Sequence, residues 1–235
     1  MGFIKKFRKS KGSSTKIGSS VSETASLMEA MSLMQMGISR KDAGDLDGAL
    51  SYFEKASSLC PERPTTGEKA WNMINAFTLV AKGSILKQRG KLDGALECFK
   101  EACSLCPDDA SATTVREEAW FNRSYLLHKL ERHEEAIDCY NQCLSLNPKW
   151  AAIWANKAVV LQKMGMTGEA MKCYDKALEL NPKDDVAWFN KGIYSLERGD
   201  LQKAREYLER AQEISPDDPA ILKALKLCNR KLGEY

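Results

Sequence analysis

The chain has 235 residues, of which 43% are hydrophobic and 29% are charged, and its formal net charge is +3. This composition is typical of a soluble globular protein with one large domain or two small ones. The sequence contains neither a run of about 18 apolar residues nor a secretory signal, which argues against a membrane span and predicts a cytoplasmic protein.

The N-terminal segment is the basic part of the chain. Residues 1–22 contain six Lys or Arg and no acid, which leaves 29 basic against 32 acidic residues in the remainder. We expect residues 1–24 to form a disordered tail. Residues 1–16 mix Phe and Ile with cations and would be the segment to touch an anionic membrane, although a solvated tail is the simpler interpretation. The mildly acidic body offers no basic face to nucleic acid.

An internal repeat organises most of the chain. In the second half, three prolines are spaced by 34 residues, and each follows a tryptophan by 28 residues. An alanine comes 16 residues after each tryptophan, and a tyrosine or leucine follows four residues later. These positions are Trp120, Ala136, Tyr140 and Pro148, then Trp154, Ala170, Tyr174 and Pro182, then Trp188, Ala204, Leu208 and Pro216.

Two further copies lie upstream and resemble each other most. GDLDGALSYFEKASSLCP (44–61) and GKLDGALECFKEACSLCP (90–107) share their alanine, phenylalanine and proline register. Leu33 and Leu79 stand in the tryptophan slot, and Gly37 and Gly83 occupy a small-residue slot four residues later. Because these residues recur at helical spacings and a proline closes each unit, each copy is predicted to be helical and to end next to its proline.

This pattern resembles the tetratricopeptide repeat, a 34-residue helix-turn-helix unit. The resemblance implies an all-α, right-handed superhelical solenoid of antiparallel helix pairs over residues 25–235, with a capping helix at 219–235. The repeats would cover residues 30–63, 76–109, 117–150, 151–184 and 185–218. Glu131 departs from the family pattern because the other repeats have glycine at this slot between the two helices.

Cys103 and Cys106 form a C-x-x-C that invites a metal or redox interpretation. However, Cys106 recurs in register as Cys60, and no second C-x-x-C or paired histidine motif supplies the other ligands of a zinc site. We therefore expect inert thiols, no metal and no cofactor. Nucleotide-binding and catalytic motifs are likewise missing, so the chain is predicted not to be an enzyme.

In the family, the first helix of each repeat lines a concave groove that holds a protein segment. The slots one, two and five residues after the tryptophan would face this groove. Asparagine in these slots can bond a peptide backbone through both a donor and an acceptor. The expected groove residues are Phe121, Asn122, Tyr125, Asn156, Phe189, Asn190 and Ile193, and the equivalent slots in the second repeat are Val80, Ala81 and Ser84.

The predicted function is that of a non-catalytic adaptor or scaffold that captures a peptide or helix of a partner protein. The alternative is a self-associating structural protein with a membrane-touching basic N-terminus. Met28, Met31 and Met34 are spaced to share one helix edge, and such an adaptable apolar edge would pack either on a second copy or on the chain's own second helix.

Overall fold

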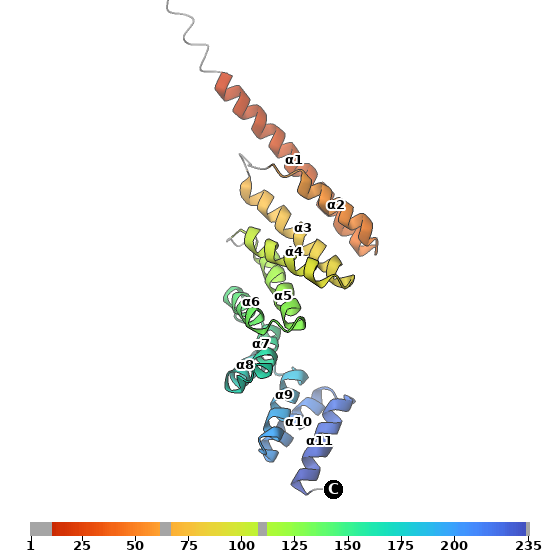
Figure 1. Cartoon of the computed structure of the whole chain (residues 1–235), viewed down its shortest axis with the longest axis vertical. Coiled ribbons are helices and arrows are strands. Elements are labelled where there is room, and N and C mark those ends of the chain that lie inside the picture. The colour runs from red at the N-terminus through yellow and green to blue at the C-terminus, as the bar shows by residue number, and fades with distance from the viewer. Residues whose placement is uncertain (1–10, 62–66, 108–111, 234–235) are drawn as a thin grey trace, which may run out of the picture. The chain divides into compact units, whose positions relative to one another are not determined.

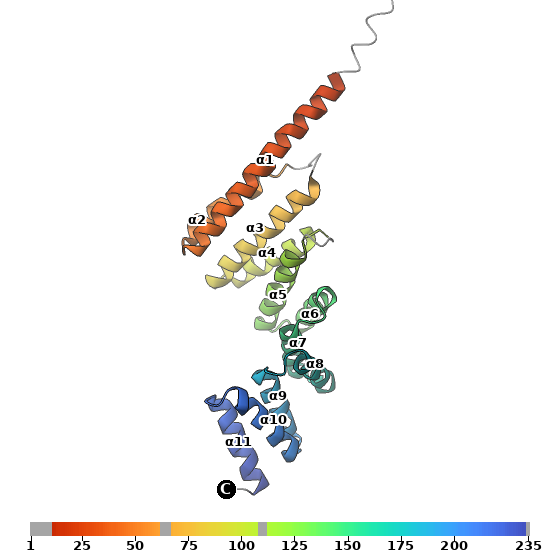
Figure 2. The ribbon, with the colours of Figure 1, turned by 180° about the vertical axis from the view of Figure 1, so that it is seen from behind.

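The structure is a computed structural model that describes residues 11–61, 67–107 and 112–233 (Figures 1 and 2). Throughout these residues the secondary structure is helical, in agreement with the predicted all-α class. The helices are α1 (Lys11–Asp42), α2 (Leu46–Ser58), α3 (Glu68–Gln88), α4 (Leu92–Leu105), α5 (Thr113–Lys129), α6 (His133–Leu146), α7 (Ala151–Lys163), α8 (Thr167–Leu180), α9 (Asp185–Glu197), α10 (Leu201–Ile214) and α11 (Pro219–Leu232).

The chain divides into two compact units between Arg123 and Ser124, within α5. In the first unit, α1 pairs with α2 and α3 pairs with α4. In the second unit, α7 pairs with α8, α9 pairs with α10, and α11 packs on α10. Each pair is made of two helices that are neighbours in sequence, as expected for a helix-turn-helix repeat.

The second helix of each pair ends where the sequence pattern places its stop. Helices α6, α8 and α10 end two residues before Pro148, Pro182 and Pro216. Proline has no N–H to donate to the helix, and it disfavours the helical conformation in the residue before it. The recurring prolines therefore set the length of each unit.

The turn between the paired helices requires a left-handed backbone. Gly90, Gly165 and Gly199 lie there with φ between 72° and 81°. Glu131 occupies the same slot and adopts the same region with φ 57°. For a residue with a side chain this conformation costs about 1–2 kcal/mol. The repeat therefore imposes its turn geometry even where the favoured glycine is missing.

Close contact between a small and a large side chain joins the two helices of a pair. A Cβ added to Gly37 would lie 2.5 Å from the Phe53 ring, and one added to Gly83 would lie 2.8 Å from the Phe99 ring. In the last pair, a Cβ on Gly192 would lie 2.6 Å from Leu208. The backbone of the first helix thus lies directly against the large side chain of the second.

Helix α1 begins at Lys11, so the disordered tail predicted for residues 1–24 is wrong from Lys11 onward; residues 1–10 lie outside the described residues. The first proline of the chain is Pro61, and nothing before it forbids a long helix. Helix α3 likewise begins at Glu68, eight residues before the predicted start of its repeat. Both first helices of this unit are longer than the family pattern implies.

Trp71 in the added turns of α3 holds these extensions together. Its side chain is 1% exposed and shares a core cluster with Ala30 of α1 and Ile74. Leu27 of α1 and Leu59, which follows α2, pack against the same cluster. The sequence pattern did not single out Trp71, because this tryptophan lies outside the repeat register.

We predict that Trp71→Ala lowers the free energy of unfolding by about 3–5 kcal/mol, because it leaves a large cavity between three segments. Urea unfolding followed by circular dichroism measures this change. The matched control is Met28→Ala on α1, where the side chain is 72% exposed, and we expect a change within about 0.5 kcal/mol. Equal effects of the two substitutions would contradict the assigned role of Trp71.

Candidate functional site

The residues predicted to contact a partner are divided between the two units. Phe121 and Asn122 belong to the first unit, and the other five belong to the second. In the second unit, Tyr125 lies on α5, Asn156 on α7, and Phe189, Asn190 and Ile193 on α9. All seven are on first helices of their pairs, two in the first unit and five in the second.

Asn122 is bound inside the protein rather than open to a ligand. Its side chain is buried, its Nδ2 donates to the Glu118 carbonyl at 2.9 Å, and its Oδ1 accepts from Lys87 Nζ at 2.6 Å. Burial lowers the pKa of Lys87, the Glu118 charge opposes this shift, and the Lys41 charge adds to it. Because both ends of the amide are used, Asn122 contributes to the packing of α3 and α5, in contrast to its expected role.

Asn156 and Asn190 occupy the same slot in successive repeats and differ from Asn122. Both side chains are half-buried. Among the residues that the structure describes, neither side-chain amide has a hydrogen-bond partner. A half-buried amide that keeps a donor and an acceptor unused is suited to bonding the backbone of an incoming chain.

The apolar residues of the predicted set are partly covered. Phe189 and Ile193 pack against the core cluster that joins α9, α10 and α11, and both remain half-buried. Tyr125 is the most exposed of the predicted set at 38%, and Lys129 Nζ lies 5.7 Å from the centre of its ring. Phe121, in the first unit, is half-buried. In the second unit, Phe189 and Ile193 leave part of their apolar surface exposed on the same helix as Asn190, as expected for protein recognition.

The thiols and imidazoles show no metal-binding arrangement in the described ranges. None of the eight cysteines forms a disulfide, and burial raises the pKa of the Cys106 thiol, which makes it less reactive. His128 and His133 lie with ring centres 6.4 Å apart. Burial lowers the pKa of His128, and the charges of Lys163, His133 and Lys129 act in the same direction.

The methionine edge of α1 is divided between the core and the surface. Met34 packs against the cluster that contains Ala49 and Phe53 of α2. Met28 and Met31 are 72% and 52% exposed. The methionines therefore pack only in part on the chain's own second helix.

None of the described helices is both long enough and apolar enough to cross a membrane.

Comparison with family models decides the classification. Residues 117–149, 151–184 and 173–206 match models described as the tetratricopeptide repeat, and residues 83–113 match a TPR repeat model. The chain belongs to the tetratricopeptide repeat family. The first helix pair, α1 and α2, lies outside the matched residues. A search of the curated proteins found no match.

Solved structures of other tetratricopeptide repeat proteins share the fold. YrrB, described as a TPR protein with an unusual peptide-binding site, is 20% identical with a TM-score of 0.68, over 87% of this chain and 97% of its own. A MamA structure is 24% identical with a TM-score of 0.65, over 80% and 92%. A protein from Parabacteroides merdae is 22% identical with a TM-score of 0.69, over 88% and 75%. These similarities confirm the all-α solenoid class.

The structure also has a cleft that none of the predicted groove residues lines. It measures about 320 Å³ and lies within the first unit, between α2, α3 and α4. Its lining residues are Phe53, Glu54, Ser57, Asn75, Thr78, Leu79, Lys82, Glu101 and Leu105. One signal in the sequence marks this place, because Leu79 stands where later repeats have tryptophan.

Proposed function

We propose that this tetratricopeptide repeat protein is a non-catalytic adaptor or scaffold that binds a peptide or helix of another protein on its first helices. Membership of the family supports this role, because these repeats are protein-interaction modules. YrrB, which has the same fold, is a TPR protein with a peptide-binding site. The observation that carries the proposal is the unused amide pair of Asn156 and Asn190.

The second unit supplies the main part of this surface. The two asparagines recur 34 residues apart on α7 and α9, and Phe189 and Ile193 lie beside Asn190. An extended segment would use the amides for its backbone and the half-buried apolar side chains for its own side chains. Asn122 is left out of this surface because a ligand would have to displace Lys87 from it.

The test replaces the amides and leaves the packing intact. We expect Asn156→Ala combined with Asn190→Ala to reduce partner capture from a host lysate at least tenfold, because two hydrogen bonds to the ligand are lost. Capture is measured by pull-down and quantitative mass spectrometry. Phe189 is not substituted, since it also packs against the core of the last repeat.

The matched control is Gln142→Ala combined with Gln202→Ala, which removes two exposed amides from the second helices α6 and α10. We expect normal capture by this control. Circular dichroism of both double variants should match that of the unmodified chain. Equal capture by the two double variants would rule out the proposed surface.

Exposure of Met28 and Met31 favours a second candidate, self-association through α1. We expect Met28→Gln combined with Met31→Gln to shift a concentration-dependent dimer toward monomer in sedimentation velocity, because an apolar contact is lost. Met166→Gln, at a residue that is 40% exposed before α8, is the control. A sedimentation profile unaffected by the double substitution would exclude this candidate. The associated membrane contact of residues 1–16 falls largely on residues 1–10, outside the described residues.

A further inference from the structure

The cleft between α2, α3 and α4 lies on the other side of α3 from the predicted groove. Asn75, Leu79 and Lys82 line it with spacings of four and three residues and therefore share one face of α3. The groove slots on α3 are Val80, Ala81 and Ser84, and at 3.6 residues per turn they fall on the opposite face. The cleft is thus a separate surface from the one proposed above.

The later repeats show which side chains normally occupy the position of Leu79 and its surroundings. In each of them a cation three residues after the tryptophan stacks on the indole ring. Arg123 lies 5.3 Å from the ring centre of Trp120, Lys157 lies 5.6 Å from that of Trp154, and Lys191 lies 5.6 Å from that of Trp188. Such stacking stabilises the pair by about 0.5–1 kcal/mol at exposed sites.

The second helix of the preceding repeat holds the cation in place. Lys157 Nζ donates to Asn141 Oδ1 at 2.7 Å, and Lys191 Nζ donates to Asp175 Oδ1 at 2.5 Å. Lys82 occupies the same slot in the second repeat, and its Nζ lies 3.5 Å from Glu54 Oε1. The cation on α3 and its partner on α2 are therefore retained, whereas the ring beneath the cation is replaced by the smaller Leu79.

The same cleft contains a buried acceptor that has no partner. The Oδ1 atom of Asn75 is buried and accepts no hydrogen bond from the described residues. In the last two repeats the indole N–H is satisfied, since Trp154 Nε1 donates to the Pro148 carbonyl at 2.9 Å and Trp188 Nε1 donates to the Pro182 carbonyl at 3.0 Å. A buried acceptor left without a donor costs about 1–3 kcal/mol, and a ligand donor would recover part of this cost.

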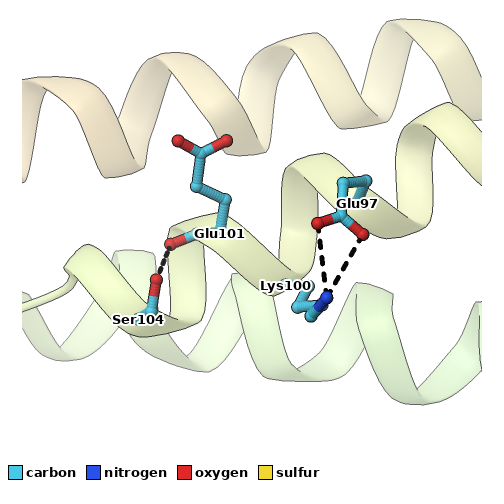
Figure 3. Close-up of polar contacts among 4 residues, drawn as sticks. All are labelled: Glu97, Lys100, Glu101 and Ser104. Carbon is cyan, nitrogen blue, oxygen red and sulfur yellow. Dashed lines mark hydrogen bonds and ion pairs between the residues drawn. The ribbon is translucent and has the colours of Figure 1, made fainter.

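A second acceptor lies on α4 at the edge of the cleft. Glu97 and Lys100 pair with each other at 3.3 Å, whereas no hydrogen bond or ion pair joins the Glu101 carboxylate to another described residue, and Figure 3 shows none to the residues drawn beside it. The Ser104 hydroxyl donates to the Glu101 backbone carbonyl and leaves the carboxylate unused. Glu101 lines the cleft with Leu105. The cleft therefore combines apolar walls, a cation and two unused acceptors.

We propose that this cleft is a socket for a tryptophan side chain of a partner protein. The indole would occupy the space that Leu79 leaves empty, under Lys82, and its N–H would donate to Asn75 Oδ1. Tryptophan side chains that fill a pocket in this way dominate the affinity of many protein interfaces. This inference is independent of the amide surface on α7 and α9.

The probe for this socket is N-acetyl-tryptophanamide, which presents the side chain as a peptide does. In titrations of the ¹⁵N-labelled full chain, we expect saturable shifts of the amide signals of Phe53, Thr78 and Leu105. N-acetyl-leucinamide should cause no saturable shift, because it has neither a ring nor a ring N–H. A response to the leucine compound equal to that of the tryptophan compound would overturn the proposal.

Two substitutions, Leu79→Trp and Asn75→Leu, test whether the probe binds in this cleft. Leu79→Trp restores the residue of the later repeats and fills the socket, so binding should weaken at least tenfold. Leu222→Trp is the control because it adds a tryptophan at an apolar side chain of α11 that is 41% exposed, and it should bind normally. Asn75→Leu removes the acceptor and should weaken binding about threefold or more.

Undiminished binding by Leu79→Trp would overturn the proposal. If Leu79→Trp does not fold, the Asn75→Leu result decides instead, and unchanged binding by Asn75→Leu would equally overturn the proposal.

Free L-tryptophan is the last compound to be tested. Tighter binding of the free amino acid than of the blocked compound would indicate a small-molecule site and exclude a partner's side chain. The Asn156→Ala and Asn190→Ala double variant should bind the probe normally, which separates this test from that of the proposed function.

Discussion

Close approach of the two helices within each pair is the constraint on which the rest of the structure depends. It requires a residue with little or no side chain on the first helix and a bulky one on the second, as in Gly37 against Phe53 and Gly192 against Leu208. Any larger residue at the small slot would separate the helices. Side chains elsewhere on the first helix are then free to point away from this contact, and these are the positions available for binding.

The same constraint explains why local departures from the repeat matter. Interiors pack at nearly crystalline density, so a smaller residue at a fixed position leaves space that its neighbours cannot close completely. Leu79 is such a departure, and the polar side chains of Lys82 and Asn75 border the space beside it. Glu131 is the opposite case, in which the backbone keeps its turn at an energetic cost.

Much of the fold could be predicted from the sequence, because alanines, aromatic residues and prolines recur at a fixed period from Trp120 onward. The early start of α3 and the burial of Trp71 could not, since they depend on contacts with α1 that lie outside the period. The residues of the candidate site were predicted only from their positions relative to the tryptophan of each repeat. A slot fixes the helix face, but it cannot show that Lys87 reaches Asn122 or that Asn156 stays unbonded. Those outcomes depend on side chains from neighbouring helices.

The central claim is that, in the second unit, a partner binds to the first helices and leaves the second helices exposed. Hydrogen exchange of the full chain, alone and with the partner that it captures, tests this claim most directly. We predict added protection in α7 and α9 around Asn156 and Asn190, with little change in α6, α8 and α10. Protection confined to α6, α8 and α10 would contradict the account.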